Sequence, residues 1–111
     1  MPKFTTEQLF DIIKAMLDEK IKKQIRKIIG QHLPADNYKI FIFGSRTTEE
    51  HRRFSDIDVG ILGQERIPGH IIVKIKEELE NSRVPYKIDV VDFQTVSDEF
   101  RRIALKKVLY L

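Results

Sequence analysis

The first third of the chain carries apolar residues at helical spacing. Thr5, followed three residues later by Gln8, is typical of a helix start. Isoleucine, leucine and methionine then recur every three or four residues, and glycine first interrupts the pattern at Gly30. This pattern predicts a helical region over residues 5–32, as one long helix or two shorter ones. The segment HLPADN that follows predicts a turn.

Three later segments are rich in β-branched and aromatic residues and predict strands. They are YKIFIF (38–43), DIDVGIL (56–62) and YKIDVVDF (86–93). Residues 44–55 lack an apolar period and predict a loop, in which a short helix after residues 44–45 is an open alternative. Apolar residues at helical spacing predict a helix over residues 70–81.

The C-terminal segment predicts a last helix over residues 97–110, capped by Thr95 or Ser97. The order of elements indicates an α+β sandwich, in which helices pack on one face of a small mixed sheet. A length of 111 residues fits a single domain, residues 1–111, whose catalytic core would span residues 38–93.

Alternation along the second strand places two aspartates together. Side chains of a strand point to opposite faces with a period of two, so the apolar Ile57, Val59 and Ile61 share one face. Asp56 and Asp58 then share the other, more open face. Gly60 lies on that face too and, having no side chain, is expected to leave space beside the aspartates.

The same rule selects one aspartate of the third strand. Ile88 and Val90 form its core set, so Asp89 points to the opposite face. If the second and third strands are neighbours, Asp89 lies on the face of Asp56 and Asp58. Asp92 has the parity of the core set and is expected to mark the end of the strand.

Three carboxylates at close quarters repel one another unless a cation lies between them. Carboxylate oxygens are preferred ligands of hard divalent cations, and Mg²⁺ takes its remaining ligands from water and substrate phosphates. Asp56, Asp58 and Asp89 therefore predict metal-assisted phosphoryl chemistry. The upstream Gly44-Ser45 pair suits close approach of backbone N–H groups to a phosphate, and Arg46 adds a charge-assisted donor.

Composition narrows the classes of function. The net charge of +3 is too small to argue for nucleic-acid binding alone, and the absence of cysteine excludes disulfides and thiolate metal sites. The sequence has no signal-peptide pattern and no apolar run near the roughly 20 residues that span a bilayer. These features predict a soluble, cytoplasmic protein without a membrane contact.

Three motifs resemble those of the minimal nucleotidyltransferases (MNT) of the DNA polymerase beta superfamily. They are FGSR (43–46), SDIDVGIL (55–62) and KIDVVDF (87–93). The resemblance implies a nucleotidyltransferase-like fold, a nucleoside triphosphate such as ATP as donor, and Mg²⁺ as cofactor. The resemblance implies that the triphosphate is bound by Gly44, Ser45 and Arg46. It also implies that the metal is bound, and catalysis performed, by Asp56, Asp58 and Asp89.

Minimal members of this superfamily are often the antitoxins of HEPN-type helical toxins, and some transfer AMP onto a tyrosine of the partner. The resemblance therefore implies AMP transfer to a hydroxyl of a HEPN protein, with nucleic acid disfavoured as the direct substrate. Thr47, Thr48 and Glu49 stand where many relatives have a small residue, an arginine and a glycine. This difference motivates an alternative, a catalytically inactive antitoxin that covers its toxin. The sequence leaves the oligomeric state open, a homo-oligomer included.

Overall fold

The protein is described from a computed structural model that covers residues 19–43, 57–84 and 86–111. Residues 19–30 are helical, and the elements that follow are η1 (Ala35–Asn37), β1 (Tyr38–Phe43), β2 (Ile57–Gly63), α2 (Gly69–Glu80), β3 (Ile88–Asp92), α3 (Asp98–Ala104) and β4 (Leu109–Tyr110). The predicted helix start at Thr5 and the predicted loop over 44–55 lie outside the described residues. Within the described ranges, no helix has the length and apolar character needed to cross a bilayer.

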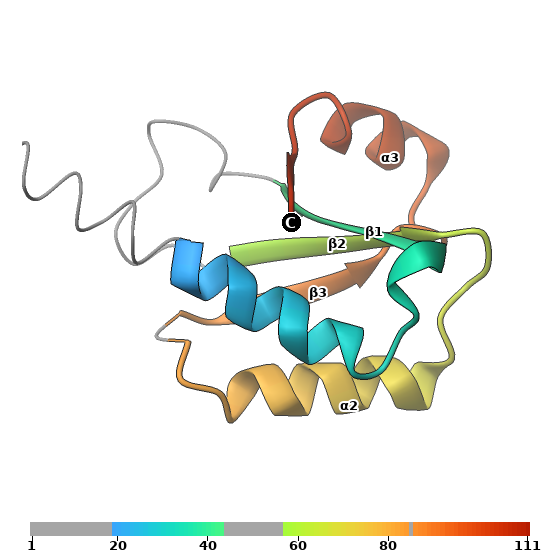
Figure 1. The fold of residues 1–111 in the computed structure, drawn as a ribbon. Helices are drawn as coiled ribbons and strands as arrows, with labels where there is room; N and C mark the ends of the chain where they lie inside the picture. Colours follow the sequence, from blue (N-terminus) through green and yellow to red (C-terminus); the bar gives the residue numbers. More distant parts are fainter. Residues whose placement is uncertain (1–18, 44–56, 85) are drawn as a thin grey trace, which may run out of the picture.

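The four strands form one mixed sheet in the order β3-β2-β1-β4 (Figure 1). β1 is antiparallel to both of its neighbours, β2 and β4. β2 and β3 are parallel and adjacent, and α2 makes the crossover between them. The predicted α+β class with a mixed sheet is confirmed.

One face of the sheet packs against the helix over 19–30 and against α2, as Figure 1 shows. The predicted apolar set of β2 faces these helices, with Ile57, Val59 and Ile61 each at most 1 % exposed. Ile25 and Ile29 of the first helix and two residues of α2, Ile75 and Leu79, complete the centre of this cluster. The alternation of β2 is therefore set by burial of its odd-numbered residues.

The opposite face is covered as well, which corrects the prediction of helices on one face only. Phe41, Phe43 and Phe93 form a second buried cluster there. Ala104 and Leu105, at the C-terminal end of α3, pack against it. In Figure 1, α3 lies across the sheet from α2. Phenylalanines on the second face need an apolar cover, and the segment after β3 supplies it.

The predicted C-terminal helix over 97–110 is wrong in its second half. The helix α3 ends at Ala104, and β4 then pairs with β1, Leu109 opposite Ile42 and Tyr110 opposite Phe41. The helix begins as one of the two proposed caps predicts, because the Ser97 hydroxyl accepts a hydrogen bond from the Phe100 N–H.

Asp92 is a structural carboxylate at the end of β3. Its side chain is 7 % exposed and accepts hydrogen bonds from the backbone N–H groups of Ile67, at 2.8 Å, and Gln94, at 2.9 Å. The first bond ties the loop before α2 to β3, and the second forms the turn that follows β3. The prediction that Asp92 marks the end of the strand is confirmed.

We expect Asp92→Asn to lower the free energy of unfolding by about 2 kcal/mol, because an amide presents an N–H₂ group to one of the two N–H donors that the carboxylate accepts from. Urea unfolding followed by circular dichroism measures the change. Asp36→Asn, at an exposed position of η1, is the matched control and should change stability by less than about 0.5 kcal/mol. Equal stability of the two variants would contradict the structural role of Asp92.

Candidate active site

Asp58 and Asp89 are direct partners on neighbouring strands. The parallel register of β2 and β3 pairs Asp58 with Asp89, and the next pair along, Val59 with Val90, points into the helix-facing core. Strands in a sheet lie about 4.8 Å apart, so the two carboxylates leave the sheet side by side on the face away from α2. Asp58 is half-buried and Asp89 is exposed. The selection of Asp89 required β2 and β3 to be neighbours, and they are.

Phe43 extends this row onto β1, where it is the register partner of Asp58. Its ring packs edge-on against Phe93, with centroids 5.1 Å apart, and against Phe100, 6.1 Å apart. Phe100 is 43 % exposed, so an apolar surface open to solvent adjoins the row of Phe43, Asp58 and Asp89, here called the carboxylate row. The sequence pattern did not lead us to include Phe43 or Phe100 among the predicted site residues. For Phe43, alternation along residues 38–43 could have placed it on the face opposite Ile40 and Ile42.

Gly60 does not leave space beside the aspartates, which corrects a second expectation. A Cβ atom built on Gly60 would lie 2.3 Å from the Phe41 ring and 2.7 Å from the Phe93 ring. Both rings are fully buried, and they pack edge-on against each other with centroids 4.8 Å apart. The missing side chain therefore admits two phenylalanine rings, which form an apolar layer directly beside the carboxylate row.

The remaining predicted site residues border the described ones in the sequence. Phe43 is the last residue of β1, and Asp58 and Asp89 are each the second residue of their strand. The chain thus leaves β1 and enters β2 at the edge where the carboxylates lie. Gly44, Ser45, Arg46 and Asp56 lie outside the described residues. Their predicted roles stay predictions.

The donor chemistry of Asp58 and Asp89 fits a hard divalent cation. Both offer carboxylate oxygens, they come from neighbouring strands, and their register brings them to one face. Within 19–43, 57–84 and 86–111, no three His, Cys, Asp or Glu side chains gather in a metal-binding group. Of the three predicted ligands, Asp58 and Asp89 belong to those ranges, and these two are register partners on β2 and β3.

Comparison with known proteins identifies the family of this fold. Over residues 23–111 the sequence matches the family described as Polymerase beta, Nucleotidyltransferase. It is 34 % identical over 93 residues to the Probable protein adenylyltransferase MntA of Haemophilus influenzae, which covers 83 % of this chain and 81 % of that relative.

Solved structures share the fold at lower identity. One is the tri-AMPylated Shewanella oneidensis HEPN toxin in complex with MNT antitoxin, with a TM-score of 0.64 and 18 % identity over 83 % of this chain and 69 % of that chain. Another, a toxin-antitoxin with AMP-PNP, has a TM-score of 0.66 and 22 % identity over 79 % of this chain and 69 % of that chain. Identities this low establish the fold alone. The family match covers most of the chain, and this chain belongs to the polymerase beta family of nucleotidyltransferases.

Proposed function

We propose that this chain transfers AMP from ATP to a hydroxyl group of a HEPN-type protein partner, and that it is the antitoxin of that pair. The observation that carries the proposal is the parallel register of Asp58 and Asp89 in a chain of the nucleotidyltransferase family. The relative called a probable protein adenylyltransferase supports the choice of AMP and of a protein acceptor. A structure described as a HEPN toxin with an MNT antitoxin supports the choice of partner.

In this proposal Asp56, Asp58 and Asp89 hold Mg²⁺, and Gly44, Ser45 and Arg46 bind the triphosphate. When bound, the metal neutralises phosphate charge and polarises the α-phosphoryl group. Asp89, the more exposed of the two described carboxylates, accepts the proton of the acceptor hydroxyl. The hydroxyl oxygen forms a bond to the α-phosphorus, the bond from that phosphorus to the bridging oxygen breaks, and pyrophosphate leaves.

The aromatic neighbours of the carboxylate row support the same chemistry. Phe43, the member of the row on β1, is 7 % exposed, and Phe93, on which its ring packs, is fully buried, so apolar side chains lie on the β1 side of the two carboxylates. A lower local dielectric strengthens the interaction of a carboxylate with a cation or a proton donor. Because the proposed donor is ATP, we place the reaction in the cytoplasm.

The test uses the full chain, ATP labelled at the α-phosphate, Mg²⁺ and the purified protein encoded by the adjacent gene. We expect label on the partner, released pyrophosphate in equal amount, and loss of both when the metal is chelated. A parallel reaction with ATP labelled at the γ-phosphate should leave the partner unlabelled, and label on the partner in that reaction would identify a kinase instead. Tight binding of the partner without any transfer would favour the inactive antitoxin that covers its toxin.

A further inference from the structure

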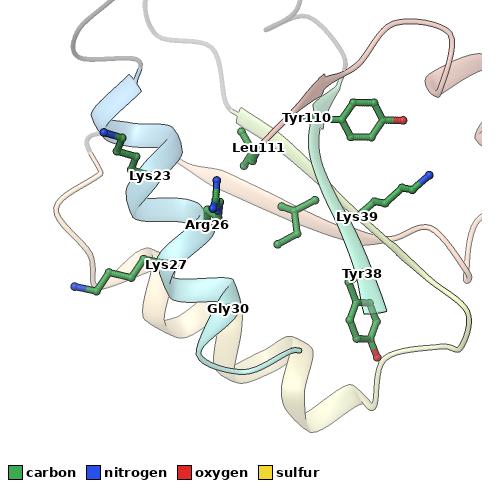
Figure 2. Close-up of a pocket in the computed structure, with 9 residues that line it drawn as sticks. Lys23, Arg26, Lys27, Gly30, Tyr38, Lys39, Tyr110 and Leu111 are labelled. Atoms are coloured by element: carbon green, nitrogen blue, oxygen red, sulfur yellow. The ribbon is translucent and has the colours of Figure 1, made fainter. Parts of the chain in front are cut away.

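A groove lies between the first helix and the β1–β4 edge of the sheet, away from the carboxylate row. Its volume is about 780 Å³. Figure 2 shows Lys23, Arg26 and Lys27 extending from the helix, whereas Lys39 and Tyr110 border the groove on the strands with side chains that extend away from the helix. We call this feature the basic groove, defined by Lys23, Arg26 and Lys27. A smaller cavity of about 170 Å³ shares Lys23 and Arg26 and continues the groove along the helix.

The charge of the groove is locally uncompensated. Lys23, Arg26 and Lys27 are spaced by three and four residues on a helix, so they share one face of it. Among the residues that the structure describes, none of the three cations of the groove has an acidic side chain within salt-bridge distance. Lys22, on the same helix, pairs with Glu19 at 3.0 Å. For a chain with a net charge of +3, three such cations along one side of a groove are a concentrated positive surface.

The groove is also lined by apolar side chains. Ile40 and Leu111 are half-buried and pack on the helix-facing core. The ring of Tyr110 lies on the other face of the sheet, where it contacts Phe41. An exposed arginine such as Arg26 beside apolar side chains is typical of the residues that anchor protein partners. These features suit an acidic segment that also carries apolar side chains.

Single-stranded nucleic acid fits the groove less well. Such ligands need aromatic ring faces on which successive bases stack. The ring of Tyr38 lies against Gly63, where an added Cβ atom would be 2.5 Å from it, so that part of the ring is covered. Tyr110 remains, and its ring already contacts Phe41 with centroids 5.8 Å apart.

We propose that the basic groove binds an acidic segment with apolar side chains on the protein partner. This inference rests on the proposed function for the identity of the partner. β4 and β3 are the opposite edges of the sheet, and the groove lies on the helix-facing side, whereas the carboxylate row lies on the other. A partner held here leaves the carboxylate row accessible, so docking and transfer are separable functions.

The test measures the affinity of the full chain for the purified product of the adjacent gene, without ATP or Mg²⁺. We expect Lys23→Glu/Lys27→Glu to raise Kd at least about tenfold near 0.1 M salt, mainly through slower association, and less at high salt. The matched control is Lys74→Glu/Lys76→Glu, the same charge change on exposed positions of α2, which should change Kd less than about twofold. Lys23→Gln/Lys27→Gln removes the charges without reversing them and should give an intermediate Kd. This pair keeps the test valid if the glutamate pair does not fold. Circular dichroism verifies the fold of each variant.

Three outcomes would overturn the docking site. The first is an unchanged Kd for the groove variants, and the second is an equal loss of affinity in the α2 control. The third is that binding of an oligouridylate probe depends on Lys23 and Lys27 whereas binding of the partner does not. The last outcome would assign the groove to nucleic acid. Because binding is measured without nucleotide and transfer is measured separately with ATP and Mg²⁺, the two proposals can fail independently. Groove-dependent binding together with no transfer in the second assay would refute the enzyme alone. Transfer and binding that are both independent of the groove would refute the docking site alone.

Discussion

Asp58→Asn is expected to lower the rate of AMP transfer by about three orders of magnitude, which corresponds to about 4 kcal/mol of transition-state stabilisation. The substitution keeps the size of the side chain and replaces a charged oxygen donor with a neutral amide on the carboxylate row. Asp89→Asn should lower the rate by about 10²- to 10⁴-fold, because the proton of the acceptor hydroxyl then has no carboxylate to receive it. Single-turnover transfer of labelled AMP to the partner measures both effects.

Stability should move in the opposite direction to activity. Two like charges directly opposite each other in a sheet are destabilising, so Asp89→Asn should leave the free energy of unfolding unchanged or raise it by up to about 1 kcal/mol. Asp36→Asn, at an exposed position of η1 outside the carboxylate row, is the control for activity. The same variant is the stability control for Asp92→Asn. A variant of Asp58 that keeps more than about a tenth of the transfer rate would refute the role of this carboxylate.

The metal dependence separates the two aspartates further. If Asp58 acts mainly as a ligand, a higher concentration of Mg²⁺ or Mn²⁺ should restore part of the activity of Asp58→Asn. The loss in Asp89→Asn should persist at saturating metal, since a missing proton acceptor is not replaced by more cation. Equal rescue of both variants would show that Asp89 is a ligand without a role in proton transfer.

The pairing of Asp58 with Asp89 could be predicted because it depends on local rules. Alternation along a strand is a property of the backbone, and burial of Ile57, Val59 and Ile61 decides which face the aspartates take. The one condition beyond local rules was adjacency of the second and third strands. A helix between two strands favours the parallel crossover that makes them neighbours, which is what α2 does.

The C-terminal segment shows where local rules end. Residues 97–110 contain enough apolar residues at helical spacing to predict one helix, yet the chain turns after Ala104 and forms β4. The competing interaction is the open edge of β1, which accepts Leu109 and Tyr110, and the Leu111 N–H also bonds to the Ile40 carbonyl at 2.9 Å. Pairing with a strand some seventy residues earlier leaves no trace in the local pattern.

The second layer of the sheet was missed for a related reason. Phe41 and Phe93 belong to strands or turns that are distant in sequence, and they meet over Gly60 only after β1, β2 and β3 have assembled. A glycine on a strand is equally consistent with open space and with close approach of another group. The sequence pattern favours neither, whereas the fold fills the position with two rings.

Gly60→Ala should therefore be strongly destabilising. The added methyl group would lie 2.3 Å from a carbon of the Phe41 ring, well inside van der Waals contact. Phe41 and Phe93 are both fully buried, so relieving the overlap requires the surrounding side chains to shift. Overpacking of this kind costs about 3 kcal/mol, which corresponds to a fall in Tm of about 10 °C for a chain of this size. Thermal and urea unfolding of the full chain measure the change.

A matched glycine makes the cause of that loss testable. Gly69, the first residue of α2, has nothing within 4 Å of an added Cβ atom, so Gly69→Ala should leave stability unchanged or raise it by up to about 1 kcal/mol. In a Phe41→Leu background the nearest ring atoms are gone, and Gly60→Ala should cost about 1 kcal/mol less than in the wild type. Because the displaced rings pack beside Phe43, the Gly60 variant should also lose transfer activity while keeping both carboxylates. A cost below about 0.5 kcal/mol, or equal costs in the two backgrounds, would mean that the aromatic layer does not require glycine at this position.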